Sequence, residues 1–176
     1  MRKLSLTITL VFLALLAVQP TAAQPDLSGQ IQDNPVVIND LSTLDEQYMR
    51  SQRNLIDDLI RRQLGGLLTG DSTNDIAILQ RLLDEGIING NQRRELQAMG
   101  IILGDLLAAE LGMNWVVYED NLGRSRALRL AETDNFLFPV TMISRRREVG
   151  NTTPIQAIFD KAVITIEPLI PALPFE

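Results

Sequence analysis

Three consecutive arginines, Arg145, Arg146 and Arg147, are the residues in this sequence best suited to chemistry. Guanidinium groups bind carboxylates and phosphates through paired hydrogen bonds, so the run could form a site for an anion or an acidic partner protein. On a helix, however, successive side chains point about 100° apart and cannot all reach one ligand. The sequence therefore favours a structural role, in which one arginine pairs with a nearby acid: Glu119, Asp120 or Glu148.

Carboxylates near predicted turns form the second group of candidates. Glu119, Asp120 and Asp134 could transfer protons or bind a hard cation such as Ca²⁺. An EF-hand loop needs acids at alternating positions and a closing Glu, and this spacing is absent. We therefore expect these acids to belong to the turns in which they lie.

The chain contains no His and no Cys, which removes much of the common catalytic chemistry. A Ser-His-Asp triad, a Cys nucleophile, a Cys or His metal site and a disulfide are all excluded. Residues 66–73, GLLTGDST, lack the closing Gly-Lys-Ser/Thr of a phosphate-binding loop. The sequence thus predicts no metal or cofactor site and favours a non-enzymatic protein over an enzyme.

Trp115 supports a rival hypothesis. It opens the first strand predicted after a long apolar helix, where a lone Trp usually anchors the core but could also stack on a ligand. The rival protein is a small-ligand binder or a carboxylate-based hydrolase with a groove near Trp115, between the helix and the sheet. Tyr118 and Arg129 are expected to face each other across the same hairpin.

The first 23 residues have the pattern of a cleaved signal peptide. Arg2 and Lys3 precede an uncharged, largely apolar run at 4–18, and small residues at Thr21 and Ala23 predict cleavage between Ala23 and Gln24. The run is shorter than the roughly 20 residues of a transmembrane helix. No Cys follows to carry a lipid anchor. We expect a soluble periplasmic or secreted protein with no stable membrane anchor after cleavage.

The net charge narrows the choice of partners. The formal charge of −6 argues against non-specific binding to nucleic acid and against an anionic membrane surface, both of which need a basic footprint. Another protein of the cell envelope is therefore the favoured partner. The oligomeric state is left open.

Hydrophobic periodicity predicts the elements that must position these side chains. Apolar residues at helical spacing predict helices at about 42–64, 74–85, 91–111 and 155–167. Strand formers predict strands at about 115–118, 126–130 and 136–138, whereas 140–148 fits either a short helix or a further strand. Helices and strands are segregated along the sequence, which predicts an α+β fold. We expect N-terminal helices packed on a small antiparallel β-sheet, followed by a C-terminal helix.

The same pattern predicts one domain at 42–167, after a flexible leader at 24–41 and before a Pro-rich tail at 168–176. Ser42 with Asp45, or Thr43 with Glu46, resembles a capping box that starts the first helix. The charged face of that helix, which includes Arg53, is expected to be solvated. Gly100 and Gly104 lie four apart on the long helix, which indicates close packing of the helix on the sheet.

Three segments resemble one family when they are taken in order. They are GIILGDLL at 100–107, GMNWVVYEDNLG at 112–123 and FPVTMISRRREVG at 138–150. Together they resemble an uncharacterised bacterial family, domain of unknown function 3806, over about residues 75–167. The sequence departs from the family pattern at Arg145, where Lys is common, and at three positions where acids are frequent: Asn121, Ser125 and Asn151. Any acidic cluster typical of the family therefore has fewer acids here. The resemblance implies an exported or envelope-associated bacterial protein and does not indicate an activity.

These observations lead to one preferred hypothesis. The chain is expected to be a soluble, non-enzymatic periplasmic module that binds another envelope protein through residues 145–147 and the adjacent hairpin. The small-ligand binder near Trp115 is the first alternative. A structural, self-assembling envelope protein is the second, and it would expose a large apolar patch.

Overall fold

The computed structural model describes residues 35–171. The predicted signal peptide, its cleavage site at Ala23 and Gln24, most of the predicted leader and residues 172–176 lie outside this range. All described residues fall within one compact unit, Asp33–Glu176.

Five α-helices and a four-stranded sheet make up the described fold, which is α+β as predicted. The helices are α1 (Thr43–Leu59), α2 (Ser72–Asp84), α3 (Arg93–Leu111), α4 (Ser144–Glu148) and α5 (Ile155–Ile166). The strands are β1 (Val37–Asp40), β2 (Asn114–Asp120), β3 (Gly123–Arg129) and β4 (Phe136–Leu137). The short helical segments are η1 (Ile60–Leu64), η2 (Pro139–Thr141) and η3 (Glu167–Leu169).

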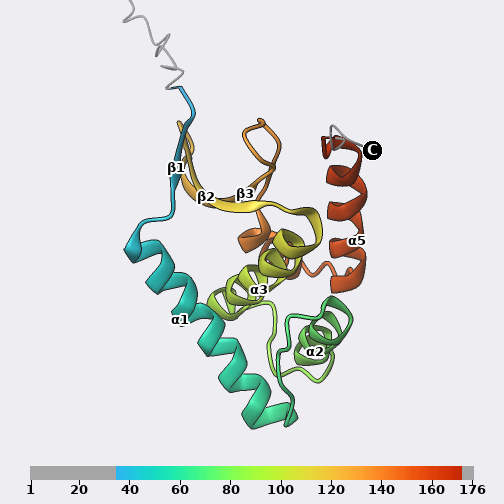
Figure 1. The fold of residues 1–176 in the computed structure, drawn as a ribbon. Helices are drawn as coiled ribbons and strands as arrows, with labels where there is room; N and C mark the ends of the chain where they lie inside the picture. The colour runs from blue at the N-terminus through green and yellow to red at the C-terminus, as the bar shows by residue number, and fades with distance from the viewer. Residues whose placement is uncertain (1–34, 172–176) are drawn as a thin grey trace, which may run out of the picture. The chain divides into compact units, whose positions relative to one another are not determined.

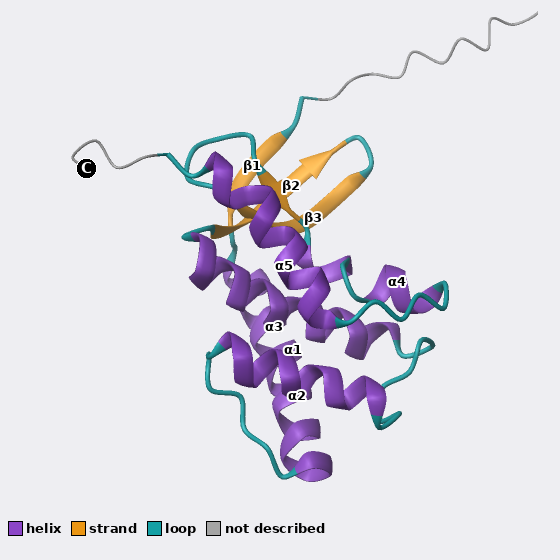
Figure 2. Ribbon diagram, turned by 90° about the vertical axis from the view of Figure 1, so that its right-hand side faces the viewer, coloured by secondary structure: helices purple, strands orange, loops and turns teal. Residues whose placement is uncertain are grey.

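The sheet is antiparallel throughout, in the order β1-β2-β3-β4. In Figure 1, α3 lies beneath the sheet, with α1 on one side and α5 on the other. Figure 2 shows the strands gathered at one end of the helical part. The α3 helix is therefore central, because helices and strands both pack on it.

Two expectations for the backbone are settled by these elements. The prediction of a flexible leader up to residue 41 is wrong at its end, where residues 37–40 form β1 and pair with β2. Three of these four residues are exposed, so backbone pairing holds the strand and leaves little hydrophobic periodicity in its sequence. The ambiguous segment 140–148 is helical, in η2 and α4.

The signals for the helix ends are confirmed. The Ser42 hydroxyl accepts a hydrogen bond from the Asp45 amide, and the Asp45 carboxylate accepts one from the Ser42 amide, which completes a capping box at the start of α1. At the C-terminal end of α3, Gly112 ends the helix with a φ of 64°, in the left-handed region that favours glycine.

Close packing on α3 depends on its two glycines. A Cβ atom at Gly100 would lie 2.6 Å from the carbonyl oxygens of both Pro139 and Val140. A Cβ atom at Gly104 would meet the ring of Trp115 and the ring of Pro139. The predicted helix-to-sheet contact is therefore confirmed at Gly104, whereas Gly100 brings η2 against the helix.

Replacing Gly104 with Ala should destabilise the protein. The added methyl group would lie 2.6 Å from Trp115 Cη2 and 3.0 Å from Pro139 Cβ, so the packing around it must shift. We expect the free energy of unfolding to fall by about 1–3 kcal/mol, the usual cost of overpacking a core. Urea unfolding followed by Trp115 fluorescence measures the change.

Gly66→Ala is the matched control for this prediction. Its methyl group would first meet a side-chain atom, Ile60 Cγ2, at 3.2 Å, and should cost less. Equal losses in the two variants would show that the contact between α3 and Trp115 accommodates a side chain.

Candidate functional site

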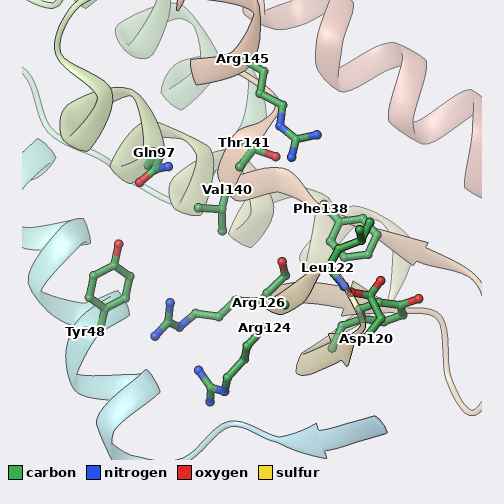
Figure 3. A pocket seen from close by; sticks show the side chains of 13 residues that line it. Tyr48, Gln97, Asp120, Leu122, Arg124, Arg126, Phe138, Val140, Thr141 and Arg145 are labelled. Atoms are coloured by element: carbon green, nitrogen blue, oxygen red, sulfur yellow. Dashed lines mark hydrogen bonds between the residues drawn. The ribbon is translucent and has the colours of Figure 1, made fainter. Parts of the chain in front are cut away.

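An open groove of about 580 Å³ lies beside the β2–β3 hairpin. Its walls come from five parts of the fold: α1, the first half of α3, the hairpin, the segment Phe138–Thr141 and α4. In Figure 3, Arg124 and Arg126 point toward Tyr48, whereas Phe138 and Leu122 lie on the other side of the hairpin. We refer to this feature as the β3 groove.

One wall of the β3 groove is built around a buried carboxylate. Asp45 is 1% exposed and receives Arg124 Nη2 at 2.6 Å and Arg126 Nη2 at 2.8 Å. The Ser42 hydroxyl donates to the same carboxylate at 2.6 Å. The hydrogen bond from Arg124 is the main reason that the pKa of Asp45 falls well below its ordinary value, so the group stays ionised. These contacts tie the start of α1 to β3.

Arg126 connects this ion pair to an aromatic side chain. Its guanidinium carbon lies 4.2 Å from the centre of the Tyr48 ring, within the range of a cation–π interaction. Its buried Nε has no hydrogen-bond partner among the described residues. The guanidinium of Arg126 is thus held in place by Asp45 and Tyr48.

Arg145 enters the groove from α4 and is exposed. Within residues 35–171, no carboxylate forms an ion pair with it. Asp120 also lines the groove, and its Oδ1 accepts a hydrogen bond from the Leu122 amide at 2.8 Å across the hairpin turn. The structure therefore brings together two of the predicted site residues, Arg145 and Asp120.

The other residues of the arginine run point elsewhere. Arg146 donates to the Met142 carbonyl and Arg147 to the Thr153 carbonyl, so both hold local backbone. Glu148 pairs with Arg93 of α3 at 2.8 Å. The expected pairing of one arginine of the run with Glu119, Asp120 or Glu148 is therefore wrong for the described residues, since backbone carbonyls take that place.

Two further candidates do not join the groove. Glu119 lies opposite Arg124 in the β2–β3 ladder and is exposed. Asp134 is exposed in the turn before β4. The expected turn position is confirmed for Asp134 and is wrong for Glu119, which lies within β2.

Trp115 serves the packing of α3 against the sheet. Its ring lies over Gly104, and its Nε1 donates to Asp105 Oδ1 at 3.0 Å. Asp105 also receives Arg53 of α1 at 2.6 Å and 2.7 Å. Arg53 is thus an exception to the predicted solvated face of α1, because it links α1 to α3.

The space expected between α3 and the sheet near Trp115 is filled by this contact. A separate hollow of about 450 Å³ touches Trp115, and Asp40 and Glu132 lie on its border. Arg129, which also borders it, is held by Glu132 and by the Thr133 carbonyl. Both contacts of Arg129 therefore stabilise the turn after β3.

The pairing expected between Tyr118 and Arg129 is wrong. The register sets Tyr118 opposite Ser125 and Arg129 opposite Asn114. The Tyr118 ring instead packs edge-on against Phe136 at 5.1 Å and against Phe138 at 5.3 Å. These aromatic contacts form a second, apolar wall of the β3 groove.

Sequence reasoning missed the residues that give the groove its charge and shape. Asp45 carried a visible signal, its capping-box spacing from Ser42, but nothing local indicated its pairing with Arg124 and Arg126, about 80 residues later. Tyr48, Gln97 and Thr141 also line the groove, and they carry no sequence signal.

Residues 75–159 match the family model described as a domain of unknown function (DUF3806). This confirms the resemblance drawn from the sequence motifs. No curated protein matches the chain. Among the described residues, no helix has the length and apolar character needed to cross a membrane.

A crystal structure of a protein from Bacteroides thetaiotaomicron VPI-5482 is similar in fold, with a TM-score of 0.67 and 17% sequence identity. The match covers 75% of this chain and 48% of that chain, so this chain spans about half the length of its structural relative. At this identity the likeness concerns the fold, because one fold carries many functions.

Removing the charge of Asp45 should destabilise the groove and the fold with it. Asp45→Asn keeps the shape of the side chain but leaves Arg124 and Arg126 without their carboxylate. At neutral pH we expect the free energy of unfolding to fall by about 2–4 kcal/mol, somewhat less than for a fully buried pair because Arg124 is half exposed. Urea unfolding of both proteins measures the loss.

The same comparison has a defined pH dependence. Pairing lowers the pKa of Asp45 below its ordinary value of 3.8, so its contribution is complete above that value and is lost as the pH falls through the lower, folded-state pKa. The gap between wild type and Asp45→Asn should therefore shrink below about pH 4. Asp57→Asn, which removes an exposed pair with Arg61, should change stability by about 0.5 kcal/mol or less. A gap for Asp45→Asn that stays constant down to pH 2 would contradict this explanation.

Proposed function

We propose that this chain is an exported, non-enzymatic interaction module whose β3 groove binds an acidic part of another envelope protein. The observation that carries the proposal is Arg145, exposed in an open groove beside Arg124 and Arg126 and free of any carboxylate partner among residues 35–171. A guanidinium in this setting is available to a carboxylate from outside.

The local charge supports an acidic partner. Three guanidiniums, those of Arg124, Arg126 and Arg145, lie near the carboxylates of Asp45 and Asp120, and Glu119 acts on Arg124 from the opposite position of the ladder. The chain as a whole has a formal charge of −6, so a groove whose charges balance is less negative than the rest of the protein. An anionic partner is therefore repelled less at the groove than elsewhere on the surface.

The uncharged walls support a polypeptide as the occupant. Leu122 is 93% exposed at the hairpin tip and Phe138 is 37% exposed, next to the Tyr118 ring. Aromatic and arginine side chains beside an apolar surface are the typical composition of protein-binding hot spots. The groove thus combines anion recognition with a surface for apolar side chains.

A small anionic ligand is the second candidate, and the size of the groove favours it. A volume of about 580 Å³ lies in the range of small-molecule sites, roughly 300–1,000 Å³. This alternative moves to the β3 groove from Trp115, whose ring packs against Gly104 and fills the space there. A carboxylate-based hydrolase is less suitable, because Asp45 is held ionised and is therefore a weak base.

Export rests on the sequence pattern of residues 1–23. A basic start, an apolar run and small residues at 21 and 23 are what a signal peptidase site requires. A periplasmic or secreted location would bring the groove into contact with envelope proteins.

Arg145→Ala should weaken partner capture in cells. The protein, tagged at its C-terminus, is crosslinked in intact bacteria, and the captured species are identified by mass spectrometry. We expect one reproducible envelope partner whose yield falls at least about tenfold, since a charge-assisted bidentate pair contributes about 1.5–3 kcal/mol. Arg62→Ala, at an exposed arginine of η1 away from the groove, is the matched control and should leave the yield unchanged.

Other results of this experiment separate the alternatives. A partner captured equally by the wild type and by Arg145→Ala would remove the groove from the proposal. Capture of a second copy of the chain would indicate self-assembly. A protein recovered alone would favour the small anionic ligand and direct the work to metabolite binding in the β3 groove.

Blocking the proposed cleavage site should leave a longer protein. Ala23→Arg puts a large charged residue where a signal peptidase needs a small one. We expect the wild type to begin at Gln24 and the variant to keep its first 23 residues, as determined by intact mass and N-terminal sequencing. Gln24→Asn, one residue beyond the cleaved bond, should be processed normally. A wild-type protein that keeps Met1 would exclude cleavage.

A further inference from the structure

We propose that the acidic partner segment binds to the β3 groove as an extended strand, added to the free edge of β3 between Gly123 and Arg126. This inference rests on the proposed function and specifies its binding mode. It follows from the pairing of the sheet, the direction of the backbone groups and the two different walls of the groove.

The first half of β3 has a strand on one side and none on the other among the described residues. From Gly123 to Arg129, every residue of β3 pairs with β2. On the opposite side, β4 pairs with Leu128 and Arg129, and then turns away into η2. About four residues of β3, or roughly 13 Å of strand, are therefore left with an unpaired edge.

The backbone groups of Arg124 and Arg126 point to this edge. The Leu130 amide donates to the Asn135 carbonyl, so residue 130 directs its backbone toward the β4 side. Backbone direction alternates along an antiparallel strand, and residues 124, 126 and 128 therefore face the same side, whereas 125 and 127 face β2. Within residues 35–171, no turn or loop backbone bonds to Arg124 or Arg126.

The free edge lies inside the groove. Arg126 and Ser125, whose side chains lie on opposite faces of the sheet, both line it. Val140 and Thr141 of η2 line it as well. An incoming strand would thus meet unpaired backbone groups along one side and have a groove wall on each face.

The two walls predict the side-chain pattern of the partner. Arg124 and Arg126 lie on the face that meets α1, and Figure 3 shows Phe138 away from them. Tyr118 packs against Phe138 and pairs with Ser125, so it lies on the face opposite the two arginines. Side chains of an added strand alternate between the two faces. The complementary segment therefore alternates acidic and apolar residues over about four positions.

The inference can be tested with a library of random eight-residue peptides displayed on phage and selected on the whole chain. We expect the selected peptides to be enriched in alternating Asp or Glu and apolar residues. One such peptide is synthesised twice, unmodified and with its alternate backbone nitrogens methylated. Methylation keeps the side chains but removes N–H donors, and should weaken binding at least about tenfold.

Amide hydrogen exchange by NMR gives the residue-level result. Binding of the unmodified peptide should slow the exchange of the Arg124 and Arg126 amides at least about tenfold. The amides of Ser125 and Ala127, which face β2, are the internal controls and should change little. Arg145→Ala should reduce affinity for the same peptide, and Arg62→Ala should not.

The outcomes distinguish this inference from the proposed function. A peptide that needs Arg145 but tolerates methylation, and leaves both edge amides unprotected, would overturn strand addition while the groove remains a binding site. Selection that yields no binder, or binders without acidic residues, would also overturn the strand-addition inference. Partner capture in cells, if it still depends on Arg145, would then uphold the proposed function independently.

Discussion

Burying the Asp45 carboxylate requires that its charge be paired, and this requirement shapes the wall of the β3 groove. An ionised carboxylate without partners would not be stable at 1% exposure. Ser42 provides the local partner, at the start of α1, and Arg124 and Arg126 provide the distant ones, from β3. The helix start and the strand are thus fixed to each other by one group. Because one carboxylate serves two guanidiniums, the second negative charge near this wall comes from Glu119, opposite Arg124 in the ladder.

The opposite side of the groove depends on close contact rather than charge. Gly100 lets the carbonyl groups of Pro139 and Val140 approach α3, and Gly104 does the same for the ring of Trp115. These contacts place η2 against the helix, and α4 follows directly with Arg145. A side chain at Gly100 would collide with the backbone of η2, the segment that leads into α4 and Arg145. The arginine without an acid in the described part of the chain is therefore positioned by residues that carry no charge.

Local patterns in the sequence predict the elements better than the site. The long apolar stripe of α3, the glycine at its end and the capping pair Ser42–Asp45 are each contained in one short segment, and each is confirmed. The strand at 37–40 is held by backbone pairing to β2, far along the chain, and leaves no such pattern. The groove is still harder to predict from the sequence, because it combines Tyr48, Arg126 and Arg145 from three elements. Of the predicted contact residues, Arg145 and Asp120 both line the groove, and only the fold could show which arginine of the run faces it.

The electrostatics of the groove suit recognition better than catalysis. A general base works best when its pKa lies near the working pH, so that it can both take and release a proton. The arginines hold the pKa of Asp45 well below its ordinary range, and Asp120 already accepts a hydrogen bond within its turn. The remaining charged groups are guanidiniums, which do not release protons at physiological pH but form strong, directional bonds to carboxylates. A fixed set of donors, next to a strand edge that has no partner among residues 35–171, suits the proposed recognition of an acidic chain segment without any change in protonation.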